Sequence, residues 1–404
     1  MAPADDAEGS ARSPSASSDA SPLADLDVWL LFAVTLVGVG NVSGVSPAFP
    51  QVVDVLDISR VQVGWVVTVY SLPGLLSAPL AGIGADRLGR KRVLVPTLFV
   101  FGIAGGACAL ARSFPVLLVL RAVQGFAAAP LVGLAITIIG DRYDGATRAA
   151  VVGYNATALN VGTAAFPAVG GMLAAIAWYV PFALPLLALP VGAAVAWKLE
   201  TPAVDGRSSA EGFRGYLRTV GARLRDRRVF GLLAVNLGIF VLIFGAFLTY
   251  VPELVETRFG ASSVVSGGVL AAASVSSALV ATQIGRLATW IPPRRLIQGS
   301  IVIDGVALVL MPLAPGVWGV GMASLFYGVA QGLNQPALQT ELSSEASRGV
   351  ILSLNGTILR LGQAGGPLLM GLALALGGIE AVFYAAGGVA LLVGLAALWL
   401  LGAA

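Results

Sequence analysis

Three charged residues stand inside otherwise apolar segments and are the first candidates for chemistry: Arg121, Asp304 and Arg360. If those segments cross a bilayer, each charge needs a partner or a wet cavity, because an isolated charge there costs several kcal/mol. The chain has no histidine and one cysteine, Cys108. Histidine-based metal sites, catalytic triads and a disulfide framework are therefore excluded. We expect no enzyme activity, no cofactor and no metal.

The elements that must position these charges are membrane helices. Of the 404 residues, 57% are hydrophobic and 11% are charged, whereas soluble domains are about 25% charged. Runs of about 17–25 apolar residues suffice to cross a bilayer. The sequence predicts an all-α polytopic membrane protein of twelve transmembrane helices, over residues 28–48, 62–84, 93–111, 114–139, 149–175, 177–197, 229–251, 263–284, 297–314, 316–339, 349–376 and 378–402.

The basic residues predict the orientation of these spans. With both termini in the cytoplasm, 19 of the 24 Lys and Arg residues fall on cytoplasmic segments and 3 on outer connectors. Basic residues favour the cytoplasmic side of a membrane. We expect a multi-pass protein in the plasma membrane of a prokaryote, since 22 Arg against 2 Lys is typical of a GC-rich genome. Residues 1–27 have the composition of a disordered tail.

The chain contains an internal duplication. A basic linker, residues 198–228, separates a first half at 28–197 from a second at 229–404. Asp141 corresponds to Glu341 at an offset of 200. Identical residues at the same offset in the fifth and eleventh spans include Arg148 and Arg348, Asn155 and Asn355, Thr157 and Thr357, Gly162 and Gly362, Pro167 and Pro367, and Gly171 and Gly371. The two six-helix halves are therefore predicted to be pseudo-symmetric.

The connector after the second span carries glycines and an acid among its bases: Gly82, Asp86, Arg87, Gly89, Arg90, Lys91 and Arg92. A basic turn alone would explain the positive charges but not the glycines or the acid. The stretch resembles the Gly-x3-Asp-Arg-x-Gly-Arg-Lys-Arg signature of the major facilitator superfamily. The resemblance implies a cytoplasmic gate in which Arg90 pairs with Asp141 and Asp86 meets the start of the eleventh helix. Since the second-half counterpart lacks the acid, we expect this latch in the first half only.

Two further motifs strengthen the resemblance. Arg121 opens Arg-x-x-Gln-Gly, which in the superfamily is associated with proton coupling; an arginine satisfied by backbone carbonyls is the alternative. The fifth span is similar to the antiporter signature, with a kinked, small-residue face. Phe166 replaces a glycine of that signature, and we expect its ring to loosen the tightest helix contact. The matching positions are Gly153, Gly162, Pro167, Gly170 and Gly171.

Arg360 lies near the middle of the eleventh span, and its repeat partner is Asn160. Carriers built from repeats place substrates at that depth. Asn41, Gln331 and Asn334 are further candidates for the substrate cavity, although each could equally serve a helix-to-helix hydrogen bond. The first span holds no carboxylate, and Asp25 and Asp27 at its entrance are expected to be solvated. An electropositive cavity favours anionic or neutral substrates over cations.

The sequence predicts a secondary carrier that works by alternating access. Proton-coupled efflux of small organic molecules is the favoured activity, and a proton symporter or facilitator for metabolite uptake is the alternative. Asp304 is the carboxylate expected to titrate, although an interhelical hydrogen bond would also explain it. There is no Gly-x4-Gly-Lys-Ser/Thr loop for ATP. The expected partners are lipid, a small-molecule substrate and protons, and the carrier is expected to be a monomer that binds no nucleic acid.

Overall fold

The structure is a computed structural model that describes residues 22–200, 221–222, 224–344 and 348–401. Within them the chain forms helices and turns but no strand. Most of the expected disordered tail and of the basic linker lies outside the described residues. Residues 22–27 of the expected tail are described: they form a short 3₁₀ helix and the start of the first long helix, which Asp25 caps by accepting a hydrogen bond from the Asp27 amide at 3.0 Å.

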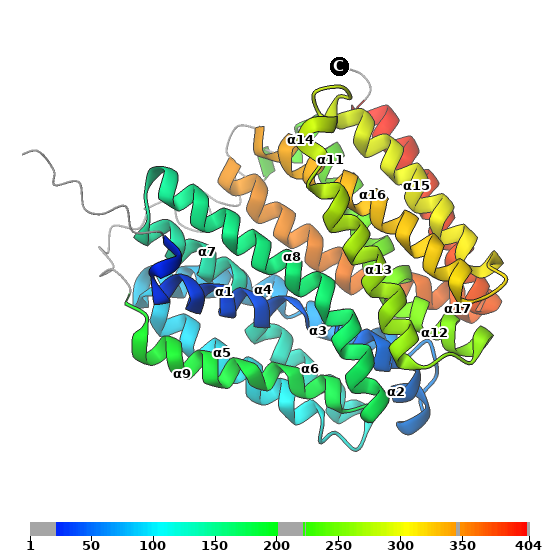
Figure 1. Ribbon diagram of the computed structural model, residues 1–404, viewed down its shortest axis with the longest axis horizontal. Coiled ribbons are helices and arrows are strands. Elements are labelled where there is room, and N and C mark those ends of the chain that lie inside the picture. Colours follow the sequence, from blue (N-terminus) through cyan, green and yellow to red (C-terminus); the bar gives the residue numbers. More distant parts are fainter. Residues whose placement is uncertain (1–21, 201–220, 223, 345–347, 402–404) are drawn as a thin grey trace, which may run out of the picture.

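The first half contains more helical segments than expected spans, because several spans are broken. Its elements in chain order are η1 (Pro22–Ala24), α1 (Leu26–Val39), η2 (Ser46–Ala48), α2 (Phe49–Val55), α3 (Gly64–Ser71), α4 (Gly74–Leu88), α5 (Arg90–Cys108), α6 (Phe114–Ala128), α7 (Leu131–Arg142), α8 (Gly145–Ile176), η3 (Val180–Leu187) and α9 (Ala188–Lys198). They occupy the lower left of Figure 1.

The second half contains longer helices and lies at the upper right of Figure 1. Its elements are α11 (Arg227–Val241), the π-helical segment η4 (Leu242–Phe247), α12 (Leu248–Phe259), α13 (Ser263–Ala281), α14 (Ile284–Leu287), α15 (Pro293–Leu313), α16 (Val317–Ser344) and α17 (Arg348–Leu401).

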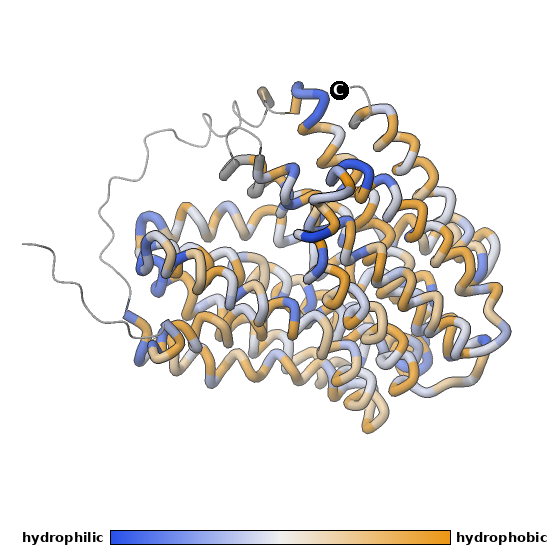
Figure 2. Tube along the Cα trace, turned by 45° about the horizontal axis from the view of Figure 1, so that its top comes forward, coloured by the Kyte–Doolittle hydropathy of each residue, from blue (hydrophilic) through white to orange (hydrophobic). Residues whose placement is uncertain are grey.

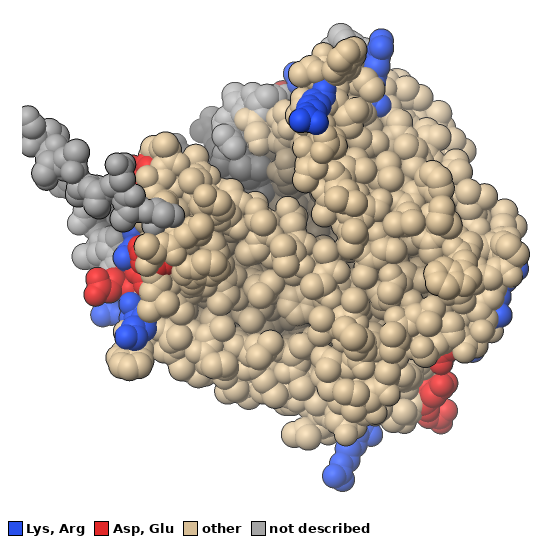
Figure 3. All heavy atoms as spheres, viewed as in Figure 1, with Lys and Arg blue, Asp and Glu red and all other residues tan. Residues whose placement is uncertain are grey.

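Nine helices of the described residues are long and apolar enough to cross a membrane. α1 is apolar but shorter, and α16 has 28 residues. α17 covers both of the last two expected spans. Its backbone leaves helical geometry between them, at Gly377 and Gly378. In Figure 2 apolar residues dominate the helices, and in Figure 3 charged side chains gather at the ends of the molecule, leaving an uncharged surface between them. This distribution fits a multi-pass membrane protein.

Two spans of the first half break at proline. Pro73 separates α3 from α4, and Pro130 separates α6 from α7. Proline lacks the backbone N–H that would continue the helix and clashes with the preceding turn. The first span also breaks after Val39 and resumes at Phe49. These breaks expose backbone carbonyls and remove side-chain bulk at mid-depth.

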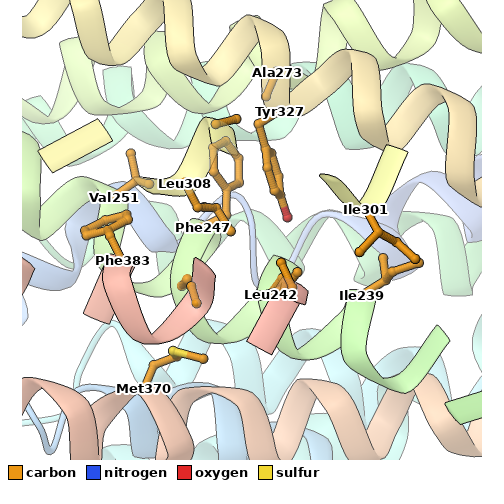
Figure 4. Close-up of a cluster of buried hydrophobic side chains, with 14 of the residues drawn as sticks. Ile239, Leu242, Phe247, Val251, Ala273, Ile301, Leu308, Tyr327, Met370 and Phe383 are labelled. Atoms are coloured by element: carbon orange, nitrogen blue, oxygen red, sulfur yellow. The ribbon is translucent and has the colours of Figure 1, made fainter. Parts of the chain in front are cut away.

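Buried apolar side chains form two clusters that match the two halves. One draws on residues from Val28 to Leu199 and the other on residues from Val229 to Ala397. In the second cluster the rings of Phe247 and Tyr327 stack with centroids 4.3 Å apart, as Figure 4 shows. Each half therefore has a core of its own, as the predicted duplication implies.

The halves meet through glycine backbone. A Cβ on Gly267 of α13 would lie 2.5 Å from the Pro167 carbonyl oxygen and 2.9 Å from the Gly171 Cα, both on α8. We call the end of the bundle where α4, α7 and α9 finish the linker side, and the opposite end the far side. Gly171 lies near the far-side end of α8. Small residues allow this close packing of membrane helices.

Phe166 does not loosen this contact, contrary to expectation. Its ring lies against Gly40, where there is no room for a Cβ, and 3.3 Å from the Cβ position of Gly162. The ring therefore fills a gap between α8 and the first span, inside the first half. Gly170 likewise packs against the backbone of Gly44 with no room for a Cβ. The helical phase turns Phe166 away from the second half, so the contact through Gly171 is unaffected.

We predict that Gly267→Val destabilises the protein by about 1–3 kcal/mol, because the added methyl groups must displace backbone atoms of α8. The midpoint of thermal unfolding of the purified chain measures the effect. Gly268→Val is the matched control, since nothing lies within 4 Å of its Cβ position. Equal midpoints for the two variants would contradict the proposed tight contact.

Candidate functional site

Arg121 of α6 is fully buried in the first half. Its guanidinium donates to Gln124 Oε1 at 2.9 Å and to the Val66 carbonyl at 3.4 Å. It also lies 4.5 Å from the centroid of the Tyr70 ring, a cation–π contact. Gln124 in turn donates to Asn41 Oδ1 at 2.7 Å. Within the described residues no carboxylate pairs with Arg121, so its charge is held by neutral oxygens and by a ring.

Arg360 of α17 crosses from the second half into the first. Its Nη2 donates to the Ala129 carbonyl at 3.4 Å. A Cβ on Gly74 would lie 2.9–3.0 Å from Arg360 Cδ, Nε and Cζ, so the side chain occupies the space that this glycine leaves. Ala129 and Gly74 stand at the two proline breaks of the first half. The breaks therefore form the seat of Arg360.

Tyr70 links the two arginines. Its ring lies under the Arg121 guanidinium, and Arg360 is near enough to act electrostatically on its phenol group. No carboxylate pairs with Arg360 in the described part of the chain either. One fully buried and one half-buried positive charge, from opposite halves, thus lie near one tyrosine without a counter-ion. Such a site stabilises negative charge.

The other predicted cavity residues lie elsewhere. Asn41 belongs to the Arg121 network and borders a small pocket with Gly40 and Phe166. Asn160 is exposed on α8. Gln331 and Asn334 instead point into the second half, where their amides donate to Asp304 at 3.1 and 3.0 Å. The interhelical hydrogen bonds considered for Asp304 are therefore present, and its proton-coupling role stays a prediction.

The predicted gate motif lies on the linker side. Arg90 Nε donates to Asp141 Oδ2 at 3.1 Å, and Arg90 also pairs with Asp86. Gly89 has φ = 100°, so the turn between α4 and α5 requires glycine. Gly82 has nothing within 4 Å of its Cβ position. The expected contact of Asp86 with the start of the eleventh helix falls outside the described side chains.

The second half contains a related ion-pair cluster. Glu341, the repeat counterpart of Asp141, lies 2.6 Å from Arg228 and 3.8 Å from Arg294. Glu341 does not replace the counterpart of Asp86, which the second connector lacks, so the one-sided latch stays a prediction. Both halves nevertheless tie the linker-side end of a central helix to a neighbouring arginine.

Glu253 is a buried carboxylate that was not among the predicted site residues. The expected span ended at residue 251, whereas α12 continues to Phe259 and leaves Glu253 only 2% exposed. Glu253 Oε1 lies 2.7 Å from Arg60 Nε, an ion pair that joins the halves on the far side. Near it, Thr68 Oγ1 donates to the Ala364 carbonyl at 2.7 Å, and Ser46 Oγ donates to the Leu248 carbonyl. The apolar Leu254-Val255 that follows was the available signal.

The acids at the start of α1 are bound rather than solvated. Asp27 lies 2.6 Å from Arg142 and is only 6% exposed. Asp25 Oδ2 accepts from the Tyr143 hydroxyl at 2.5 Å. Burial and this hydrogen bond raise the pKa of Tyr143 to about 12. These contacts attach the entrance of α1 to the end of α7.

Comparisons with known proteins agree with this geometry. The sequence model of the Major Facilitator Superfamily matches residues 31–364. The chain belongs to the Major Facilitator Superfamily.

The relatives include a protein named as an exporter and one named for quinolone resistance. The chain is 27% identical to the bacillibactin exporter of Bacillus subtilis (strain 168) over 83% of this chain and 87% of that one. It is 24% identical to the quinolone resistance protein NorA of Staphylococcus aureus (strain MRSA252), over 90% and 93%. Among solved structures, the D323A mutant of the nucleoside transporter NupG superposes with a TM-score of 0.75 at 15% identity, over 93% and 99%. A member of this superfamily with these relatives is a membrane transporter of small molecules.

We predict that Gly74→Ala moves Arg360 out of its seat, because the new methyl group would lie within 3.0 Å of three side-chain atoms. The rate of transport of an organic anion should therefore fall several-fold, while the expression level is unchanged. Gly133→Ala is the control, since its Cβ position has no neighbour within 4 Å. A normal transport rate in Gly74→Ala would show that Arg360 does not need this seat.

Proposed function

We propose that the protein is a proton-coupled exporter of small organic molecules that favours anionic or neutral substrates over cations. One observation carries the substrate preference: Arg121 is fully buried, Arg360 is half-buried, and neither has a carboxylate partner among the described residues, although both lie near Tyr70. A buried arginine without an anion gains most when a ligand supplies one. The name of one relative, the bacillibactin exporter, supports the direction of transport.

Arg360 is the residue that we assign to the substrate. Its single hydrogen bond to the Ala129 carbonyl, at 3.4 Å, is long, and the guanidinium retains further donors. A carboxylate, sulfonate or phosphate can accept two of them at once. Arg121 is held more firmly, by Gln124, Val66 and Tyr70, and serves to keep the site positive.

The proposal includes alternating access with the linker side in the cytoplasm, as the distribution of basic residues indicates. In this structure the halves touch on the far side through Gly171 and Gly267, through Thr68 and Ala364, and through Arg60 and Glu253. The described far side is thus closed between the halves. We assign the gate to the clusters at Arg90 and Glu341, which must rearrange when the linker side closes.

Proton coupling requires a carboxylate that changes its environment. Asp304 and Glu253 both lie within spans and are both buried. We propose Asp304 as the carboxylate that titrates, and we separately propose a coupling role for Arg121, which stands in the motif associated with proton coupling. If neither carboxylate titrates during transport, the alternative of a facilitator is favoured; if protons move with the solute, the protein is a symporter.

We predict that Arg360→Ala lowers the apparent affinity for an aromatic carboxylate about tenfold or more, which corresponds to the loss of a charge-assisted hydrogen bond of about 1.5–3 kcal/mol. Proteoliposomes with an internal pH dye measure proton movement while the carboxylate, a neutral amphipath and a quaternary ammonium ion are added in turn. Arg360→Lys keeps the charge and should retain part of the affinity.

Arg112→Ala is the control for the loss of an arginine outside the spans. Protons that move opposite to the carboxylate support antiport. Equal affinity of wild type and Arg360→Ala for the carboxylate would exclude the proposed substrate site, whereas proton movement in the same direction as the solute would exclude export by antiport.

A further inference from the structure

A polar seam runs between α15 and α16 inside the second half. On α16 it consists of residues spaced three, four and three apart, which places them on one face of the helix. On α15 two residues four apart oppose them. The seam comprises Ser324, Tyr327, Gln331 and Asn334 on α16 and Ser300 and Asp304 on α15, and none is more than 9% exposed.

The surroundings of this seam are apolar. Ile301 and Leu308 lie on α15 beside Asp304 and belong to the buried cluster, as does the ring of Phe247 that stacks on Tyr327. Figure 4 shows Phe247 beside the Tyr327 ring, and Ile301 next to Ile239 in the same cluster. In such surroundings each polar atom costs free energy unless it is paired. The polar atoms of the seam must therefore be paired with one another or with a bound ligand.

Asp304 accepts two hydrogen bonds from neutral donors. Gln331 Nε2 donates to Oδ1 at 3.1 Å, and Asn334 Nδ2 donates to Oδ2 at 3.0 Å. Within the described residues no Lys or Arg forms an ion pair with Asp304, which is fully buried. Two amide donors do not replace the hydration of a carboxylate. When Asp304 is ionised, the site therefore lacks one positive charge.

The acceptors around Asp304 are also incomplete. Gln331 Oε1 and Asn334 Oδ1, on the two amides that donate to Asp304, are buried and have no hydrogen-bond partner. A proton on Asp304 would supply a single donor and could satisfy one of these oxygens. A metal cation can be shared by several oxygens at once. The number of unpaired oxygens therefore favours a cation over a proton alone.

The amides are placed to turn toward such a cation. Their nitrogens now lie about 3 Å from the carboxylate oxygens, and half a turn about the last side-chain bond would place Gln331 Oε1 and Asn334 Oδ1 there. Oxygens at that separation can share an ion with oxygen–metal distances of about 2.3–2.6 Å, the range for Ca²⁺, which is close to Na⁺ in size. The Tyr327 hydroxyl lies near Gln331 and Asp304.

We propose that this seam binds one dehydrated Na⁺ ion, ligated by Asp304, Gln331 and Asn334. A monovalent ion matches the single carboxylate, whereas a divalent ion would leave one positive charge buried. The site is separate from the arginines. It is connected to them through α16, where Gln335, next to Asn334, donates to Asn236 at 3.4 Å, and Asn236 donates to Asn355 of α17.

This inference bears on the coupling ion of the proposed function but is measured without transport. Binding of ²²Na⁺ to the purified full-length protein at pH 8 should reach one ion per chain and should not be reduced by equal concentrations of choline. Low pH should displace the ion, since a proton competes for Asp304. Asp304→Asn should abolish binding, whereas Asp144→Asn, which changes an exposed cap of α8, should leave it unchanged.

Gln331→Ala and Asn334→Ala test the amide ligands in chains that retain the carboxylate, and each should weaken Na⁺ binding about tenfold or more. Thermal unfolding gives a second measurement, because an ion that binds the native state raises the midpoint with its concentration. No ²²Na⁺ binding by the folded wild-type chain would overturn the proposal, as would equal stabilisation by Na⁺, K⁺ and choline. Export of the organic anion in sodium-free buffer would be unaffected by that failure, so the two proposals can fail separately.

Discussion

The absence of water in the bilayer governs this structure, because every polar group placed there must find its partner inside the protein. Arg121 meets most of this requirement with an amide, a carbonyl and an aromatic ring, although its Nη2 has no partner, and Asn236 meets it with Asn355. Arg360 meets it only by reaching into the other half. Arg360 and Asp304 have no counter-charge among the described residues, and they are the groups that we connect with ligands. In a soluble protein water could supply the missing hydrogen bonds, and the same unpaired groups would be weaker evidence for a ligand.

Contacts between the halves and contacts within them differ along the membrane normal. Arg90 with Asp141, and Arg294 with Glu341, each stay within one half on the linker side. On the far side Gly171 meets Gly267, and Arg60 meets Glu253 across the halves. Backbone contacts through glycine leave little room for adjustment, whereas ion pairs at a surface can exchange partners at low cost. A rocking motion of two rigid halves would use the ion pairs as the adjustable part.

Much of the architecture could be predicted because it depends on local composition. Apolar runs gave the helices, and the offset of 200 residues indicated the halves. Arg121 and Gln124, three residues apart on one helix, could be expected to meet. The direction of Phe166 could not, since it depends on the phase of α8 against a broken first span. Glu253 was missed because a charge was taken as the end of a span, although its partner Arg60 comes from the other half. The space that Arg360 occupies is formed by two breaks in separate helices. No local sequence pattern predicts that the two breaks lie at the same depth in the membrane.

The π-helical segment η4 changes which residues of its span face the other half. It lies between α11 and α12, and Thr249 Oγ1 donates to the carbonyl of Phe244, five residues earlier, at 2.5 Å. One residue of an α-helix turns the chain by about 100°, so the extra residue of a π turn shifts the direction of every later side chain by a similar angle. Tyr250 faces Pro367, and Glu253 faces Arg60, in this shifted phase. A relative with a regular α-helix here would present different positions to the interface, even where the aligned sequences look alike on both sides of the segment.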